Sequence, residues 1–119
     1  MSIDKNYYVI AGYDLTEAMT DKYEDWKWED EGEQYRYNQI NGRVQLFDDP
    51  MSGSHLYLGF IIASGDEYYF ETQTFNPWHV TDLKQDVDKV ADELVKFEII
   101  DDAKAKHIRF QIIAFEECT

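Results

Sequence analysis

The 119-residue chain is strongly acidic, because 25 Asp and Glu residues outnumber 11 Lys and Arg residues and leave a net charge of −14. This surplus argues against direct binding to nucleic acid and against docking on an anionic membrane, since both need clustered positive charge. The hydrophobic share of 44% and the aromatic share of 16% indicate a folded domain rather than a disordered acidic chain. The length predicts a single domain over residues 1–119.

The single cysteine, Cys118, has no partner for an internal disulfide, which favours a reducing compartment. Residues 1–5 lack the basic and apolar regions of a signal peptide, and the apolar runs are too short to cross a bilayer. We therefore expect a cytoplasmic protein without a membrane partner.

The first predicted elements are a strand and a helix. The strand covers Asn6–Tyr13, where Gly12 indicates a bulge or a close backbone approach. Asp14 and Glu17 have the spacing of a capping box, which predicts a helix that ends near 29–32, where Gly32 follows a run of like charges. The apolar positions of one helical face are Leu15, Met19, Tyr23 and Trp26.

Four strands, a second helix and a last strand follow. The strands are expected at 34–40, 43–47, 55–63 and 68–75, with 55–63 at the centre of the sheet. The second helix begins at Thr81 and carries a regular apolar stripe up to Phe97. The last strand covers 107–115.

This order, β-α-β-β-β-β-α-β, predicts an α+β fold with an antiparallel sheet of about five to six strands. Each of the two amphipathic helices has one apolar face, so we expect both to cover the same side of the sheet. The sequence leaves open whether the first and last strands lie side by side.

No catalytic signature is present. Nucleophile motifs, glycine-rich phosphate loops and calcium loops do not occur, so we predict no catalytic residue, no metal, no cofactor and no enzyme activity. One alternative is a metal site made by His55 with Asp48 and Asp49 across a loop of turn-forming residues. The simpler interpretation of His55 is a histidine at a strand edge.

The region Asp14–Glu33 is the candidate binding surface, because nine acids and two lysines give it a local charge of −7, half of the net charge. On a helical wheel Trp28 falls among these carboxylates rather than over the core. Exposed aromatic residues beside charge are typical of contact sites. The predicted partner-binding residues are Glu17, Asp21, Glu24, Asp25, Trp28, Glu29, Asp30 and Glu31. The alternative is a solvated helix face.

A second candidate is a tyrosine-rich sheet face that carries Tyr57, Tyr68 and Tyr69 beside the loop 48–54. Such a face can be a binding platform, and the competing interpretation is ordinary cross-strand packing. Together with an exposed sheet edge it suggests a structural protein that oligomerises.

In size, acidity, tyrosine content and lack of motifs, the chain resembles the small accessory proteins encoded by phages and prophages of Gram-positive bacteria. The segments that carry this resemblance are the acidic stretch Glu17–Asp30 and the loop Asp48–Ser54. The resemblance implies an inhibitor whose acidic surface imitates nucleic acid and occupies a basic site on a nucleic-acid-handling protein. The assembly protein is the second hypothesis, and a small-ligand binder or enzyme is the third. The oligomeric state stays open.

Overall fold

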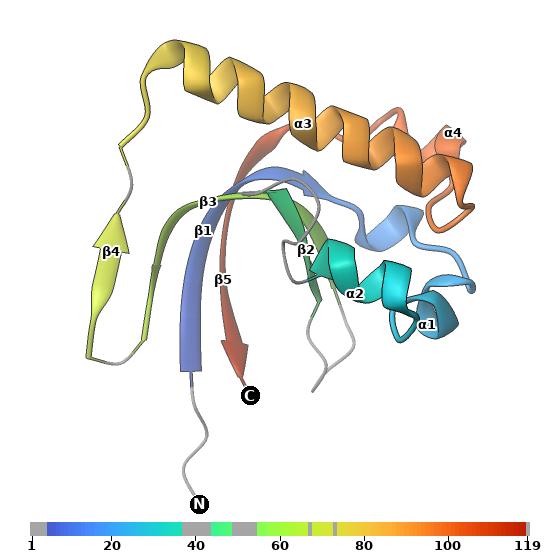
Figure 1. Ribbon diagram of the computed structural model, residues 1–119, viewed down its shortest axis with the longest axis horizontal. Coiled ribbons are helices and arrows are strands. Elements are labelled where there is room, and N and C mark those ends of the chain that lie inside the picture. The colour runs from blue at the N-terminus through green and yellow to red at the C-terminus, as the bar shows by residue number, and fades with distance from the viewer. Residues whose placement is uncertain (1–4, 37–43, 49–54, 67, 73, 119) are drawn as a thin grey trace, which may run out of the picture.

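The computed structural model describes residues 5–36, 44–48, 55–66, 68–72 and 74–118. It is an α+β fold with a five-stranded antiparallel sheet, as the sequence predicts (Figure 1). The strands are β1 (Lys5–Asp14), β2 (Val44–Asp48), β3 (Leu56–Gly65), β4 (Phe70–Thr72) and β5 (Gln111–Cys118). The helices are the 3₁₀ turn η1 (Thr16–Ala18), α1 (Tyr23–Trp26), α2 (Asp30–Arg36), α3 (Pro77–Lys96) and α4 (Asp102–Ala105).

The main path through the sheet is β2-β3-β1-β5, and β4 pairs with β3 on the side where β2 also lies. The prediction that 55–63 forms the central strand is confirmed, because β3 pairs with β1, β2 and β4. The first and last strands are neighbours, with Tyr8 opposite Phe115. Their pairing joins the two ends of the described chain at the side of the sheet where β5 is the last strand.

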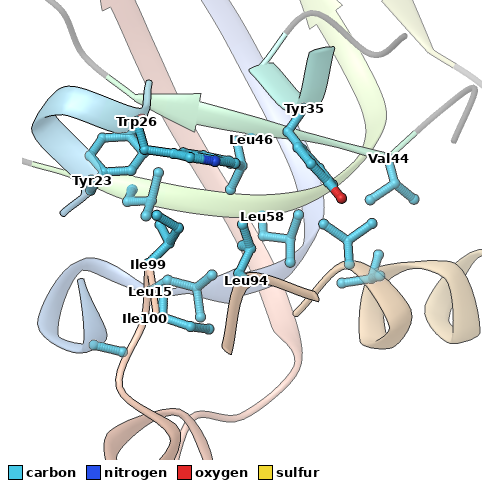
Figure 2. Close-up of a cluster of buried hydrophobic side chains, with 14 of the residues drawn as sticks. Leu15, Tyr23, Trp26, Tyr35, Val44, Leu46, Leu58, Leu94, Ile99 and Ile100 are labelled. Carbon is cyan, nitrogen blue, oxygen red and sulfur yellow. The ribbon is translucent and has the colours of Figure 1, made fainter. Parts of the chain in front are cut away.

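All the helices pack on one face of the sheet, which we call the helix-covered face. The buried α3 residues Val87, Val90 and Leu94 share one core with the β3 residues Leu58 and Phe60. Aromatic residues of α1 and α2 and the segment after α3 complete the same core (Figure 2). The amphipathic α3 therefore behaves as predicted, with its apolar stripe on the sheet.

The opposite face of the sheet, which we call the open face, carries a cluster of rings. Tyr8, Phe47 and Phe115 are in mutual contact, with ring centroids 5.5 Å apart in each pair. The ring of Tyr57 lies 4.9 Å from that of Phe115. Tyr57 is opposite Asp14 whereas Phe115 is opposite Tyr8, six residues earlier on β1, so a flat sheet would hold the two rings roughly 20 Å apart. The sheet is therefore strongly bent towards this face.

Two glycines make this bend sterically possible. Gly12 and Gly59 are directly opposite each other on β1 and β3. A Cβ atom on Gly12 would lie 1.9 Å from the carbonyl oxygen of Leu58. The close backbone approach predicted for Gly12 is thus confirmed, whereas the bulge in β1 lies earlier, between Val9 and Ile10.

The prediction of one continuous helix after β1 is wrong. The Asp14 carboxylate accepts hydrogen bonds from the backbone N–H and the hydroxyl of Thr16, which turns the chain into η1 instead of a long helix. Met19 then forms a bridge with Ile100, and the Thr20 N–H donates to the Ile99 carbonyl at 2.9 Å. This pairing with the segment after α3 overrides the helical periodicity.

Three further sequence predictions need correction. Gly32 does not end a helix: it lies inside α2, where a Cβ would meet the Trp26 carbonyl oxygen at 2.1 Å. The strand expected at 34–40 is helical from 34 to 36, and the rest of it lies outside the described residues. α3 begins four residues before Thr81, because the Asn76 side chain caps it and Pro77 occupies its first position.

Candidate functional site

The predicted binding residues all lie in one compact region, residues 14–36, which we call the acidic lobe. Glu17 is on η1, Glu24 and Asp25 are on α1, and Asp30 and Glu31 begin α2. Asp21, Trp28 and Glu29 lie in the turns between these elements. These residues therefore come from three short elements and the turns between them instead of from one helical face.

Each predicted binding residue in the lobe is exposed, and Trp28 retains 62% of its accessible surface. Two of the carboxylates have internal partners as well: Glu24 pairs with Lys27 at 3.0 Å, and Glu31 accepts a hydrogen bond from the Trp26 indole at 2.9 Å. The acidic groups therefore form an outer layer, of which Glu24 and Glu31 also fix the lobe's own structure.

The positive groups of the lobe are placed differently. Lys27 and Arg36 are each only 8% exposed, although lysine and arginine are rarely buried. Lys22 pairs with Glu98, just beyond the end of α3. Consequently the lobe's cations face inwards or are paired, and its solvent-facing surface is dominated by carboxylates.

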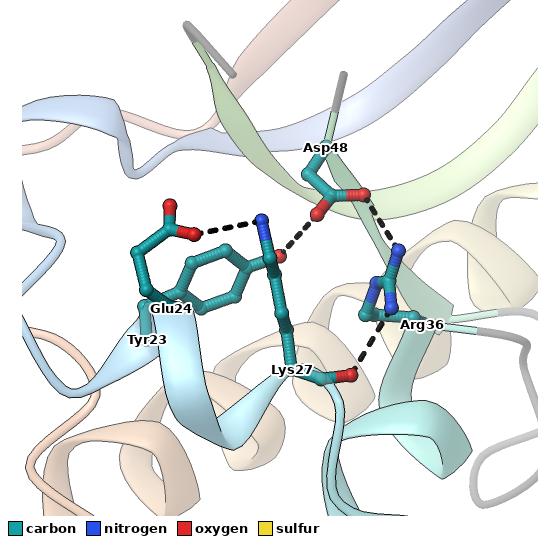
Figure 3. Close-up of polar contacts among 5 residues, drawn as sticks. All are labelled: Tyr23, Glu24, Lys27, Arg36 and Asp48. Atoms are coloured by element: carbon teal, nitrogen blue, oxygen red, sulfur yellow. Dashed lines mark hydrogen bonds and ion pairs between the residues drawn. The ribbon is translucent and has the colours of Figure 1, made fainter. Parts of the chain in front are cut away.

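A buried polar network holds the lobe on the sheet (Figure 3). The Asp48 carboxylate at the end of β2 accepts a hydrogen bond from the Tyr23 hydroxyl at 2.8 Å and pairs with Arg36 at 3.3 Å. Arg36 also donates to the Lys27 carbonyl oxygen at 3.1 Å. Burial, followed by the Asp48 charge, raises the pKa of Tyr23, so its hydroxyl stays a donor.

The same cations support the exposed indole. The Arg36 guanidinium lies 5.1 Å from the centre of the Trp28 ring, and the Lys27 ammonium lies 5.3 Å from it. Such cation–π contacts are worth about 0.5–1 kcal/mol at exposed sites. The indole of Trp28 is thus held by contacts with two cations, although the surface around it is negatively charged.

The metal alternative at His55 is not supported. Asp48 has its side chain on the helix-covered face, bonded to Tyr23 and Arg36, whereas the His55 ring stacks on Tyr57 at 4.3 Å on the open face. Asp49 lies outside the described residues. No cluster of three or more metal-binding side chains occurs among the residues that the structure places.

The three tyrosines of the predicted platform differ in exposure. Tyr57 lies near the start of β3 and is partly buried in the ring cluster of the open face. Tyr68 and Tyr69 follow the far end of β3 and are 93% and 63% exposed. Tyr57 is therefore covered by neighbouring rings, whereas Tyr68 and Tyr69 face solvent.

Sequence reasoning missed a second exposed region, residues 68–72 and 74–80, which we call the aromatic arm. Its large apolar side chains face solvent even though it contains β4 and the start of α3; they are Tyr68, Tyr69, Phe70, Trp78 and Val80. Figure 1 places β4 and the start of α3 at the opposite end of the molecule from α1 and α2. Two features of the sequence could have indicated this region. They are the aromatic triplet Tyr68–Phe70 and the pair Pro77–Trp78.

Comparison with protein-family models, with curated proteins and with solved structures finds no match to this chain. None of the helices in the described segments is both long and apolar enough to cross a membrane.

Proposed function

We propose that the protein is a non-enzymatic protein-binding module whose acidic lobe binds a basic protein surface. The observation that supports this most directly is the separation of charge in the lobe, where the carboxylates are exposed while Lys27 and Arg36 are buried. A surface of one sign attracts an oppositely charged partner over long range and raises the rate of association.

Trp28 would supply the short-range part of this binding. Tryptophan is enriched among the residues that dominate interface energies, and a supported indole loses little conformational freedom on binding. Its exposed surface lies next to Glu29 and Asp30, so charge and apolar contact are available at the same place.

The finer proposal is an inhibitor that occupies a site for nucleic acid. A protein that binds a duplex carries clustered Lys and Arg residues for the phosphates, and those residues would also attract the lobe. Duplex DNA and this protein would then compete for one partner, and both would bind less tightly as the salt concentration rises.

The proposal is tested by capturing partners on the immobilised protein and comparing two variants of equal charge. One variant neutralises the lobe through Asp21→Asn, Asp25→Asn, Glu29→Gln and Asp30→Asn. The control neutralises four exposed or half-exposed acids elsewhere, through Glu71→Gln, Asp82→Asn, Asp86→Asn and Asp92→Asn.

We expect the lobe variant to lose the captured partner and the control variant to keep it, with added duplex DNA displacing the partner from the unmodified protein. Equal retention by both variants would contradict the assignment to the lobe. Retention of the partner in the presence of excess DNA would contradict the inhibitor proposal. It would still be compatible with the broader proposal of a protein-binding module.

The aromatic arm supports a second candidate function, assembly of several copies of this chain. β4 pairs only with β3 among the described strands, and its outer edge lies beside exposed rings. Exposed apolar patches at a sheet edge favour association. The segment 68–80 contains a single acid, Glu71, so we expect little electrostatic repulsion between copies there.

Sedimentation of the full chain at increasing concentration tests assembly. A salt-insensitive oligomer that the double variant Phe70→Ser and Trp78→Ser converts to a monomer would support it. A monomer at every concentration would exclude this function.

A further inference from the structure

A hollow of about 650 Å³ lies on the open-face side, where the ends of three elements meet. Its lining comes from the end of β1 and η1, from the start of β3, and from the chain that enters β5. Phe110 packs on the helix-covered side against Tyr13 and Phe60, which leaves its neighbours Arg109 and Gln111 to line the hollow.

The hollow adjoins the most basic segment of this acidic chain. Residues 104–109 contain Lys104, Lys106, His107 and Arg109 and no acid, so three of the eleven Lys and Arg residues fall within six positions. His107 lines both this hollow and an adjacent one that Lys104 also lines. Positive side chains are therefore concentrated beside the hollow, in a protein with a large negative surplus.

Arg109 has a guanidinium available for a ligand. Lys106 pairs with Asp102 at 3.1 Å, but the Arg109 side chain makes no hydrogen bond or ion pair within the part of the chain that the structure describes. Carboxylates are the most abundant charged groups of this protein, and none of those described holds it. A planar guanidinium matches the two oxygens of a carboxylate.

The wall beside Arg109 supplies an aromatic surface. His55 and Tyr57 stack with an angle of 12° between their rings, and both line the hollow. Ile108 adds an apolar contact.

Two acids limit the charge of the ligand. Glu17 and Asp14 also line the hollow, although the Asp14 carboxylate already accepts two hydrogen bonds from Thr16. A dianion such as phosphate would be repelled by these groups more strongly than a monoanion. The lining therefore favours a singly charged ligand with a flat apolar body.

We propose that this hollow binds a small aromatic carboxylate, with the carboxylate on Arg109 and His107 and the ring against Tyr57 and Ile108. The site is independent of partner binding by the acidic lobe, apart from Glu17, which borders both. It gives the protein a small-ligand site where the end of β1, η1, the start of β3 and the chain entering β5 meet.

Benzoate is the probe for this site, and its binding to the isotopically labelled full chain is followed by NMR. We expect saturable shifts of the Arg109 side-chain and His107 signals at millimolar benzoate, with weaker binding of acetate, benzyl alcohol and inorganic phosphate. Arg109→Gln should weaken benzoate binding about tenfold or more, since a charge-assisted hydrogen bond is lost. Arg109→Lys, which keeps the charge, should lose less.

Lys89→Gln is the matched control, because Lys89 is exposed on α3 and does not line the hollow. It should leave the affinity for benzoate unchanged, and the spectra of all variants report whether they fold. The proposal is overturned if benzoate causes no saturable shifts at these residues, if Arg109→Gln binds as well as the unmodified protein, or if phosphate binds more tightly than benzoate.

Discussion

The acidic lobe and the aromatic arm distribute the same kinds of residue in opposite ways. In the lobe, Tyr23, Trp26 and Tyr35 are buried and the carboxylates are outside. In the arm, Tyr68, Phe70 and Trp78 are outside, and hardly any charge accompanies them. The two regions lie at opposite ends of the molecule (Figure 1).

The difference shows what holds a short helix in place. α1 and α2 are too short to be stable alone, and they persist because their aromatic residues enter the common core and Arg36 reaches Asp48. The start of α3 needs no such support, because it continues a long helix that is anchored further along by Val87, Val90 and Leu94. The exposed Trp78 is therefore not needed to hold the start of α3 in place.

The sharpest contrast in stability is expected between two tryptophans. Trp26→Ala should lower the free energy of unfolding by about 3–5 kcal/mol, because Trp26 is only 6% exposed and its removal leaves a cavity. Trp78→Ala should change it by less than about 0.5 kcal/mol, since Trp78 is 69% exposed. Urea denaturation measures both, and similar losses in the two variants would contradict the comparison.

The next largest effect is expected at the network beneath the lobe. Asp48→Asn keeps the shape of the side chain but removes the negative charge of the buried ion pair with Arg36, which should cost about 3 kcal/mol. The control is Asp102→Asn, which breaks the exposed pair with Lys106 and should cost less than about 0.5 kcal/mol. Chemical denaturation of both variants decides whether the buried pair anchors the lobe.

Alkaline pH should loosen the lobe. Burial and the Glu93 carboxylate raise the pKa of Tyr35, and burial with Asp48 raises that of Tyr23. The unfolded chain therefore loses these protons first, at the ordinary tyrosine pKa of about 10. The stabilisation is complete below that pH and is lost as the pH rises above it.

The measurement is the free energy of unfolding from about pH 8 upwards, compared with that of Tyr35→Phe. The variant should lose less stability than the unmodified protein over the same range. A parallel decline in both proteins would show that Tyr35 contributes nothing to the alkaline transition.

The smallest effect is expected at Trp28, the aromatic residue in the lobe that is not buried. Trp28→Ala removes the cation–π contacts with Arg36 and Lys27 and should cost about 1 kcal/mol. Thermal denaturation should show a modest shift, while partner capture should fall sharply. Unchanged capture would exclude Trp28 as an anchor.

The sequence predicted the fold class well, because the sheet and α3 depend on regular patterns. Alternating or continuous apolar runs mark β1, β2 and β3, and the stripe of α3 has a clear helical period. The lobe was predicted less well, since its backbone is set by contacts distant in the sequence. Thr20 bonds to Ile99, and Met19 pairs with Ile100, and neither contact leaves a local signal.

The candidate binding site was likewise predicted only in part. The exposure of Trp28 and its carboxylates was predicted, although the single helix used to derive it does not exist. The burial of Arg36 was not predicted, because it depends on Asp48 arriving from β2. The hollow at Arg109 was also missed, since it joins three segments that are far apart in the chain.

The most direct measurement of the central claim is a hydrogen-exchange and NMR footprint of the protein in complex with its captured partner. The account predicts protection and shifted signals across Asp21–Glu31, including the Trp28 indole, while Tyr68–Phe70 and Trp78 stay as in the free protein. A footprint confined to the aromatic arm, with the lobe unchanged, would contradict it.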